Sequence, residues 1–169
     1  MAGAPVPLAH IDPQSGDHVD LLATEIDPPV HPGSRHLIAY WDQCRGLPEG
    51  LTVGRDLPAR AILKILDRLY LLDPVEGATD FRFRLAPSGL IRRFGTDVSG
   101  HLLSDLYTGK AFEQYAQSLR QTLELERPVS YDVRMIGTAK EVMHLERVSV
   151  PVKSRDLGRT LLLGGTFYF

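Results

Sequence analysis

Two short apolar runs near the middle of the chain predict a β-hairpin. The second run, residues 81–85, alternates strictly between apolar residues and arginines, so Phe81, Phe83 and Leu85 are expected to face the interior. A turn-like stretch separates it from the first run, residues 70–75. The sequence therefore predicts two neighbouring antiparallel strands at this point of the chain.

Three further strand-like runs close the chain. Residues 129–136 alternate between apolar and polar side chains, and residues 141–152 form a longer β-rich run. Residues 160–169 are apolar on both faces, which is typical of a strand in the middle of a sheet. Gly164 and Gly165 interrupt this last run, and they indicate either a close backbone approach or room for a ligand beneath the strand.

A different spacing in residues 35–45 predicts a helix. Leu37, Tyr40, Trp41 and Cys44 recur at intervals of three and four, which gives one apolar stripe. Because so short a helix is not stable alone, the stripe must be buried. We expect it to pack on the sheet of its own domain or to pair with its twin in a dimer.

Helical patterns also occupy the middle of the chain. Residues 58–69 and 110–126 each carry apolar positions on one helical face. Between them, residues 88–106 predict two small helices, the first ended by Gly95 in a left-handed conformation and the second preceded by Gly100.

The first 34 residues contain half of the prolines, which remove backbone donors and disfavour long helices and central strands. Residues 17–26 are the exception, because several apolar side chains gather there. Residues 1–34 are therefore expected to form a flexible arm, or else an arm that lies on the domain or on a partner subunit.

Composition narrows the class of protein. The hydrophobic share of 43% suits one globular domain. The net charge of −2 and the lack of clustered basic residues argue against a nucleic-acid surface. A single cysteine excludes an internal disulfide, and no apolar run has the length of a membrane span or the form of a secretion signal. A cytoplasmic protein without membrane insertion is the default expectation.

The order of these elements, with Gly95, Gly100 and the leucines around them, resembles that of PAS domains, and the closest resemblance is to short bacterial, alphaproteobacterial-type proteins made of a single PAS domain. The resemblance covers residues 35–169 and implies an α+β fold: a PAS-like five-stranded antiparallel sheet with a helical crossover, preceded by N-terminal helices. It also places the last strand centrally, beside the first.

A PAS domain encloses a core between the sheet and its small helices, which can be a ligand pocket or simply filled. Alternation and this resemblance together nominate the side chains that would line it. An apolar or weakly polar ligand is expected there, with Tyr131 or His101 as the orienting donor. The candidates are Phe83, Leu85, His101, Leu102, Phe112, Tyr131, Val133, Met135, Leu161, Leu163 and Phe167.

Cofactor chemistry finds little support in the sequence. Cys44 lies before the core and lacks the residues that precede a flavin-adduct cysteine, so a buried structural thiol is favoured. His101 and His144 could bind haem iron, but the expected crossover helix contains no histidine. The paired arginines, Arg92 and Arg93, favour a solvated surface over an anion site. No metal, haem or flavin is predicted.

These observations favour a non-enzymatic sensor or adaptor that acts through protein contacts. The predicted partner or homodimer surface is the stripe of Leu37, Tyr40, Trp41 and Cys44. Because the chain ends in the last strand, no output segment is expected after it. The alternative is a small-molecule carrier or enzyme on a curved-sheet fold, PAS-like or NTF2-like, in which Tyr131, His101 or His144 would supply a titratable group.

Overall fold

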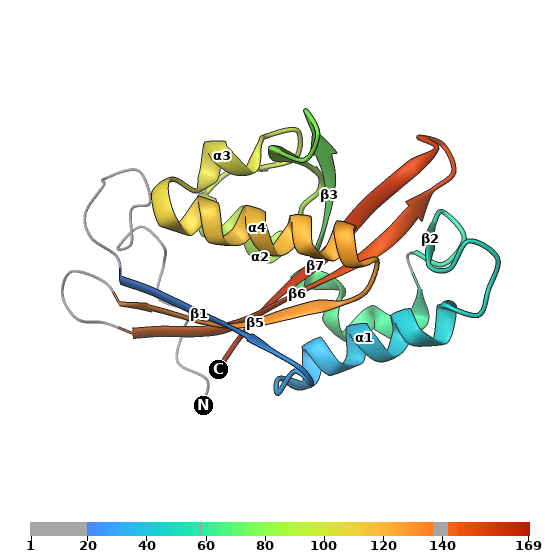
Figure 1. The fold of residues 1–169 in the computed structure, drawn as a ribbon, viewed down its shortest axis with the longest axis horizontal. Coiled ribbons are helices and arrows are strands. Elements are labelled where there is room, and N and C mark those ends of the chain that lie inside the picture. Colours follow the sequence, from blue (N-terminus) through green and yellow to red (C-terminus); the bar gives the residue numbers. More distant parts are fainter. Residues whose placement is uncertain (1–19, 58, 137–141) are drawn as a thin grey trace.

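The fold is built on one twisted antiparallel sheet (Figure 1). The computed structural model describes residues 20–57, 59–136 and 142–169. Its sheet has seven strands, six of them in the spatial order β1-β5-β6-β7-β3-β4, and the short β2 pairs in parallel with the end of β6. The strands are β1 (Asp20–Ile26), β2 (Thr52–Val53), β3 (Leu69–Val75), β4 (Asp80–Leu85), β5 (Val129–Ile136), β6 (Val142–Ser154) and β7 (Arg159–Tyr168).

The strand that is apolar on both faces lies in the middle, as predicted. β7 pairs antiparallel with β6 on one side and with β3 on the other, and β3 and β4 form the predicted hairpin. The PAS-like fold class is therefore confirmed. The sheet has two more strands than the five expected, because β1 and β2 join it.

β1 comes from the N-terminal arm, for which the sequence left open a flexible segment or an arm that lies on the domain or on a partner subunit. It runs antiparallel to β5, from the pair Asp20 and Ile136 to the pair Ile26 and Ser130. Its Leu21 and other inward-facing side chains pack against the apolar side chains of β5 and β6. Residues 20–26 of the arm thus form an edge strand of the sheet and residues 32–34 begin α1, whereas residues 1–19 lie outside the described residues.

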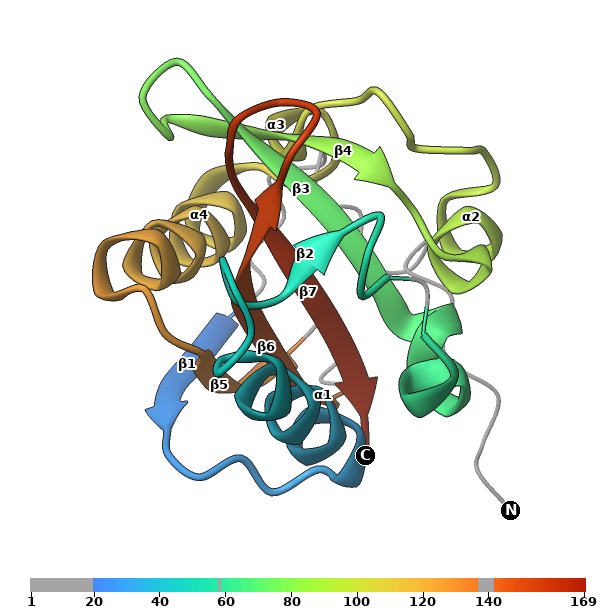
Figure 2. The ribbon, with the colours of Figure 1, turned by 90° about the vertical axis from the view of Figure 1, so that its right-hand side faces the viewer.

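Helices cover both faces of the sheet (Figure 1). We call the face covered by α1 (Pro32–Cys44) and the 3-10 helix η2 (Arg60–Arg68) the outer face. The inner face is covered by α3 (Leu103–Leu106) and the long crossover helix α4 (Gly109–Leu125). The remaining helix, α2 (Ser88–Phe94), lies beside η2 (Figure 2). As predicted, Gly95 ends α2 in a left-handed conformation, with φ of 72°.

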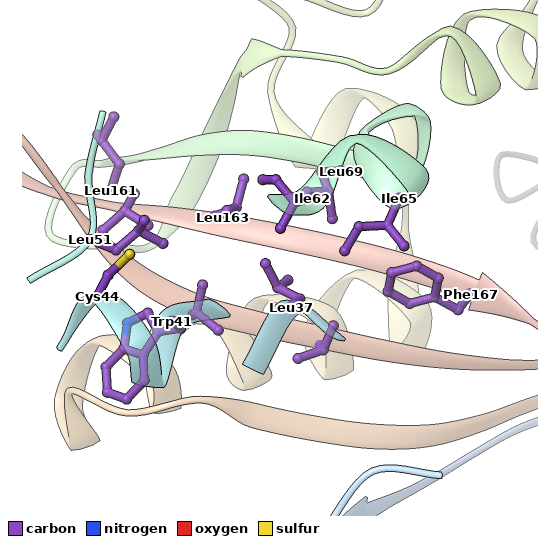
Figure 3. Close-up of a cluster of buried hydrophobic side chains, with 13 residues drawn as sticks. Leu37, Trp41, Cys44, Leu51, Ile62, Ile65, Leu69, Leu161, Leu163 and Phe167 are labelled. Atoms are coloured by element: carbon purple, nitrogen blue, oxygen red, sulfur yellow. The ribbon is translucent and has the colours of Figure 1, made fainter. Parts of the chain in front are cut away.

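The main apolar core lies between α1, η2 and the outer face (Figure 3). The stripe of α1 packs there against alternate residues of β6 and β7, from Val148 to Phe167. The approach is close at the start of the helix, because a Cβ on Gly33 would lie 2.3 Å from the ring of Phe167. Glycine is therefore needed at that position of α1.

One buried carboxylate joins three strands. Asp73 of β3 is 2% exposed and accepts hydrogen bonds from Arg84 of β4, at 2.8 and 3.0 Å, and from Arg159 of β7. Burial raises the pKa of Asp73, but the hydrogen bonds from Arg159 and Arg84 outweigh it and hold the pKa below its ordinary value.

Candidate functional site

The predicted pocket residues do not share one cavity. Phe83 and Phe112 belong to the cluster between the inner face and α4. Tyr131, Val133 and Met135 belong to a separate inner cluster that includes residues of β1. Half-buried Leu102 precedes α3 and forms an isolated bridge with Arg82 of β4. The remaining candidates need correction.

Three of those candidates lie on the outer face of the sheet. Leu161, Leu163 and Phe167 pack against α1, because alternate side chains of β7 point to the opposite faces from those expected. Leu162 is the residue of that strand that faces the inner cluster. Leu85 and His101 are exposed, since Leu85 ends β4 and His101 lies in the loop before α3.

The predicted partner surface also needs correction. Leu37, Trp41 and Cys44 are buried against the sheet of their own domain, and Trp41 donates its indole N–H to the carbonyl of Pro151 at 2.9 Å. Tyr40 is half-buried, and burial raises its pKa to about 12. Burial likewise raises the pKa of the Cys44 thiol, as expected for an inert structural cysteine.

The inner face contains a tyrosine cluster that the sequence did not reveal. Tyr70 of β3, Tyr115 of α4 and Tyr107 before α4 are all buried. The hydroxyl of Tyr115 donates to that of Tyr70, which lies 3.2 Å from the hydroxyl of Thr166. Burial raises the pKa of both Tyr70 and Tyr115, so neither can supply a negative charge near neutral pH.

Arg147 of β6 projects into this cluster and is 6% exposed. Its guanidinium carbon lies 4.1 Å from the ring centroid of Tyr115 and 5.5 Å from that of Tyr107. Its Nε has no hydrogen-bond partner, and Nη1 reaches only the side-chain oxygen of Gln114, at 3.5 Å. Among the described residues no carboxylate forms an ion pair with it. The cluster therefore contains a positive charge without a counter-charge.

The preceding residue, Glu146, is buried on the other face. Its carboxylate accepts hydrogen bonds from the backbone N–H groups of Val30, at 3.0 Å, and His31, at 3.1 and 3.2 Å. His31 in turn caps α1, because its Nδ1 accepts the N–H of Gly33 at 2.9 Å. Glu146 thus fixes the start of α1 on the outer face.

The cap requires a neutral imidazole, because a protonated Nδ1 cannot accept a hydrogen bond. Burial lowers the pKa of His31, against an opposing effect of Glu146. The ring also stacks on that of Phe167, with 5.0 Å between the centroids. The environment therefore favours the form of His31 that caps the helix.

The other candidates from the sequence lie outside the tyrosine cluster. His144 is on the outer face, 2.6 Å from a carboxylate oxygen of Asp132 and stacked on Phe169. Tyr131 donates to Gln121 at 2.7 Å. No group of three metal-ligating side chains occurs within the described ranges. Arg92 is exposed, as predicted, while the side chain of Arg93 lies outside the described residues.

The paired glycines of β7 allow close packing. A Cβ on Gly164 would lie 2.2 Å from the ring of Tyr70, and one on Gly165 would lie 2.7 Å from the ring of Phe167. Aromatic rings therefore fill the space on both sides of the strand. This arrangement favours the close-approach interpretation over a ligand space beneath the strand.

A groove of about 380 Å³ lies elsewhere, where the ends of α1 and α4 approach β6. None of the predicted pocket residues, all of which the structure describes, lines it. Trp41 and Pro151 form part of its wall, and its rim mixes the cations Arg45 and Lys153 with the anions Glu49 and Glu126. The groove thus has no dominant charge.

In the part of the chain that the structure describes, no helix has the length and hydrophobicity needed to span a membrane.

The comparison with protein-family models agrees with this architecture. The model of the PAS domain family matches residues 30–166, from the start of α1 into β7. No curated protein matches the chain. Two solved structures of the PAS-B domain of Drosophila melanogaster Cycle, the wild type with bound ethylene glycol and a tryptophan-to-alanine variant with bound glycerol, are each 10% identical, with a TM-score of 0.41. Each of these two matches covers 59% of this chain and 99% of the chain in the solved structure. Since the family model spans most of the sequence, the chain belongs to the PAS domain family.

Proposed function

We propose that this protein is a non-enzymatic signalling sensor or adaptor that acts in the bacterial cytoplasm, as a homodimer, by changing its contacts with a protein partner. Membership of the PAS domain family supports a sensory role. The partner contact is assigned to the solvent-facing side of α1, where Ala39, Asp42 and Gln43 are exposed, because the apolar stripe of the helix is occupied by the sheet.

One observation carries the proposal: two consecutive residues of β6 connect the two faces of the sheet. Arg147 sits among the tyrosines of the inner face, and Glu146 fixes the start of α1 on the outer face. A movement of β6 caused by a change around Arg147 would also move the carboxylate that positions α1. This is a physical link between a sensing core and a signalling helix, and its coupling energy can be measured.

The test compares two substitutions on exposed helix positions. Ala39→Arg changes the solvent side of α1, and Gln117→Arg makes the same kind of change on α4, across the sheet. We expect the wild type and Gln117→Arg to sediment as dimers and Ala39→Arg as a monomer, because a bulky cation at the contact disrupts it. Circular dichroism checks that all three proteins are folded.

Trp41→Arg is unsuitable for this purpose, because a buried charge at that position would disrupt the core instead of the surface. A wild type that remains monomeric at all concentrations, together with a partner that Ala39→Arg still binds normally, would overturn the proposal. A carrier or enzyme would instead retain a defined small molecule in stoichiometric amount, which native mass spectrometry detects.

A further inference from the structure

We propose that residues 5–8 of the N-terminal arm dock on an apolar patch of the outer face of the sheet. This contact does not depend on the proposed function. The patch consists of large apolar side chains that remain exposed on four neighbouring strands, β1, β5, β6 and the end of β7. They are Leu22 (63% exposed), Ile136 (38%), Val142 (63%) and Phe169 (57%).

The strand registers bring these side chains together on one face. Ile136 pairs with Val142 of β6 and, on its other side, with the residue of β1 two positions before Leu22. Phe169 donates its backbone N–H to the carbonyl of His144, two residues after Val142, and the two rings stack with 4.3 Å between their centroids. The alternate side chains of the same strands fill an inner cluster instead. The patch therefore belongs to the outer face.

Helix α1 leaves this part of the outer face uncovered. The core under α1 includes residues of β6 only from Val148 onward. Ile136 and Val142 lie at the other end of the pair of β5 and β6, away from α1 (Figure 1). Contiguous exposed apolar side chains of this kind are typical of a docking surface.

The position of the arm makes it the favoured occupant. The arm enters β1 at Asp20, which pairs directly with Ile136 of the patch. Residues 9–19 connect residues 5–8 to β1 and can span up to roughly 36 Å. The patch extends over three strand spacings, or about 15 Å. A tether of this length gives an effective concentration of about a millimolar, which a second molecule in dilute solution does not reach.

The composition of residues 5–8 favours docking on the face of the sheet over pairing with its edge. Proline alternates there with an aliphatic residue. Because proline has no backbone N–H, this stretch cannot extend the sheet beyond β1 as a regular strand. Proline-rich segments bind instead through their side chains, on surfaces that present aromatic rings. The stacked rings of His144 and Phe169 provide such a surface beside Val142.

Disulfide trapping in the full chain tests the contact. All variants carry Cys44→Ala, because Cys44 is the only native cysteine. Leu8→Cys is combined either with Val142→Cys in the patch or with Glu113→Cys on the exposed side of α4, across the sheet. With oxidised glutathione as the oxidant, we expect the pair with Val142→Cys to close roughly tenfold faster than the pair with Glu113→Cys.

A charge in the arm distinguishes docking from random encounter. Val6→Asp should slow the closure of the pair with Val142→Cys to the rate of the pair with Glu113→Cys, because a carboxylate is costly to bury against apolar side chains. Gln14→Asp adds the same charge outside the docking residues and should leave the rate unchanged. Circular dichroism checks that every variant is folded.

Two results would overturn the inference. One is an equal rate of closure for the two cysteine pairs. The other is a disulfide that forms equally fast between a chain with only Leu8→Cys and a chain with only Val142→Cys, which would assign the patch to a second molecule. Dimerisation through α1 is measured separately by sedimentation, so a failure of either proposal leaves the result for the other intact.

Discussion

Replacing Glu146 tests whether a buried carboxylate holds α1 on the sheet. The side chain is 0% exposed and accepts the N–H groups of Val30 and His31, just before the helix begins. Glu146→Gln keeps the shape and one acceptor oxygen, but its amide N–H₂ would face one of the two backbone donors. Glu146→Ala removes both acceptors and leaves two backbone donors in a buried site.

The structure allows an estimate of the two effects. A hydrogen bond to a charged group contributes about 1.5–3 kcal/mol, and removal of a buried charge returns part of its desolvation cost. We therefore expect Glu146→Gln to lower the free energy of unfolding by about 1.5 kcal/mol and Glu146→Ala by about 3 kcal/mol. For a chain of this size, the first figure corresponds to a fall in Tm of roughly 3–6 °C.

Trp41 provides the assay, because it is the only tryptophan and it lies in α1 against the sheet. Urea titration followed by its fluorescence reports the docking of α1, and far-ultraviolet circular dichroism reports the whole fold. We expect the fluorescence midpoint to fall further than the dichroism midpoint. The matched control is Glu113→Gln on the exposed side of α4, which should leave both midpoints unchanged. Identical midpoints for Glu146→Gln and wild type would refute the reasoning.

Three further predictions concern single contacts. Asp73→Asn should lower the free energy of unfolding by about 2 kcal/mol, a small value for a buried carboxylate because both arginines are nearly half exposed. Since the pKa of Asp73 is lowered in the folded protein, its contribution to stability is lost as pH falls below about 4. In urea titrations across that pH window, the variant should therefore lose less stability on acidification than the wild type. Gly164→Ala should cost about 1–3 kcal/mol by pushing the ring of Tyr70, whereas Gly46→Ala, with open space around it, should be neutral in the same denaturation assay. His31→Asn keeps a side-chain acceptor for the helix cap. Because the pKa of His31 is lowered in the folded protein, the Tm of the wild type should decline as pH falls through about 6.5. The Tm of the variant should decline less over the same pH range.

The sequence was sufficient to predict the order of the elements from α1 onward, except β2, and the central position of β7, because strand periods and an apolar run on both faces are local signals. The side-chain parity of β7 was not predictable in the same way. Leu161, Leu162 and Leu163 are consecutive leucines, and a shift of one residue exchanges the faces of the whole strand. This explains why three pocket candidates were assigned to the wrong face.

The burial of Glu146 and Arg147 was not predicted, for a related reason. These two charged residues are consecutive in a largely apolar strand-like run, and the pattern of that run does not explain them. Their burial depends on long-range packing by α1 and α4, which no local pattern encodes. Similarly, β1 was obscured by the prolines around it, although Leu21 and its neighbours gave an apolar patch.

The position of β1 affects how this domain should be produced in the laboratory. β1 ends at residue 26, so it lies before the stretch that the family model matches. A fragment trimmed to that stretch would lose the strand that covers β5 and would leave a long row of unpaired backbone groups on β5. Such an edge attracts strands from other molecules, so the trimmed fragment should precipitate or form aggregates under conditions in which the longer chain stays in solution.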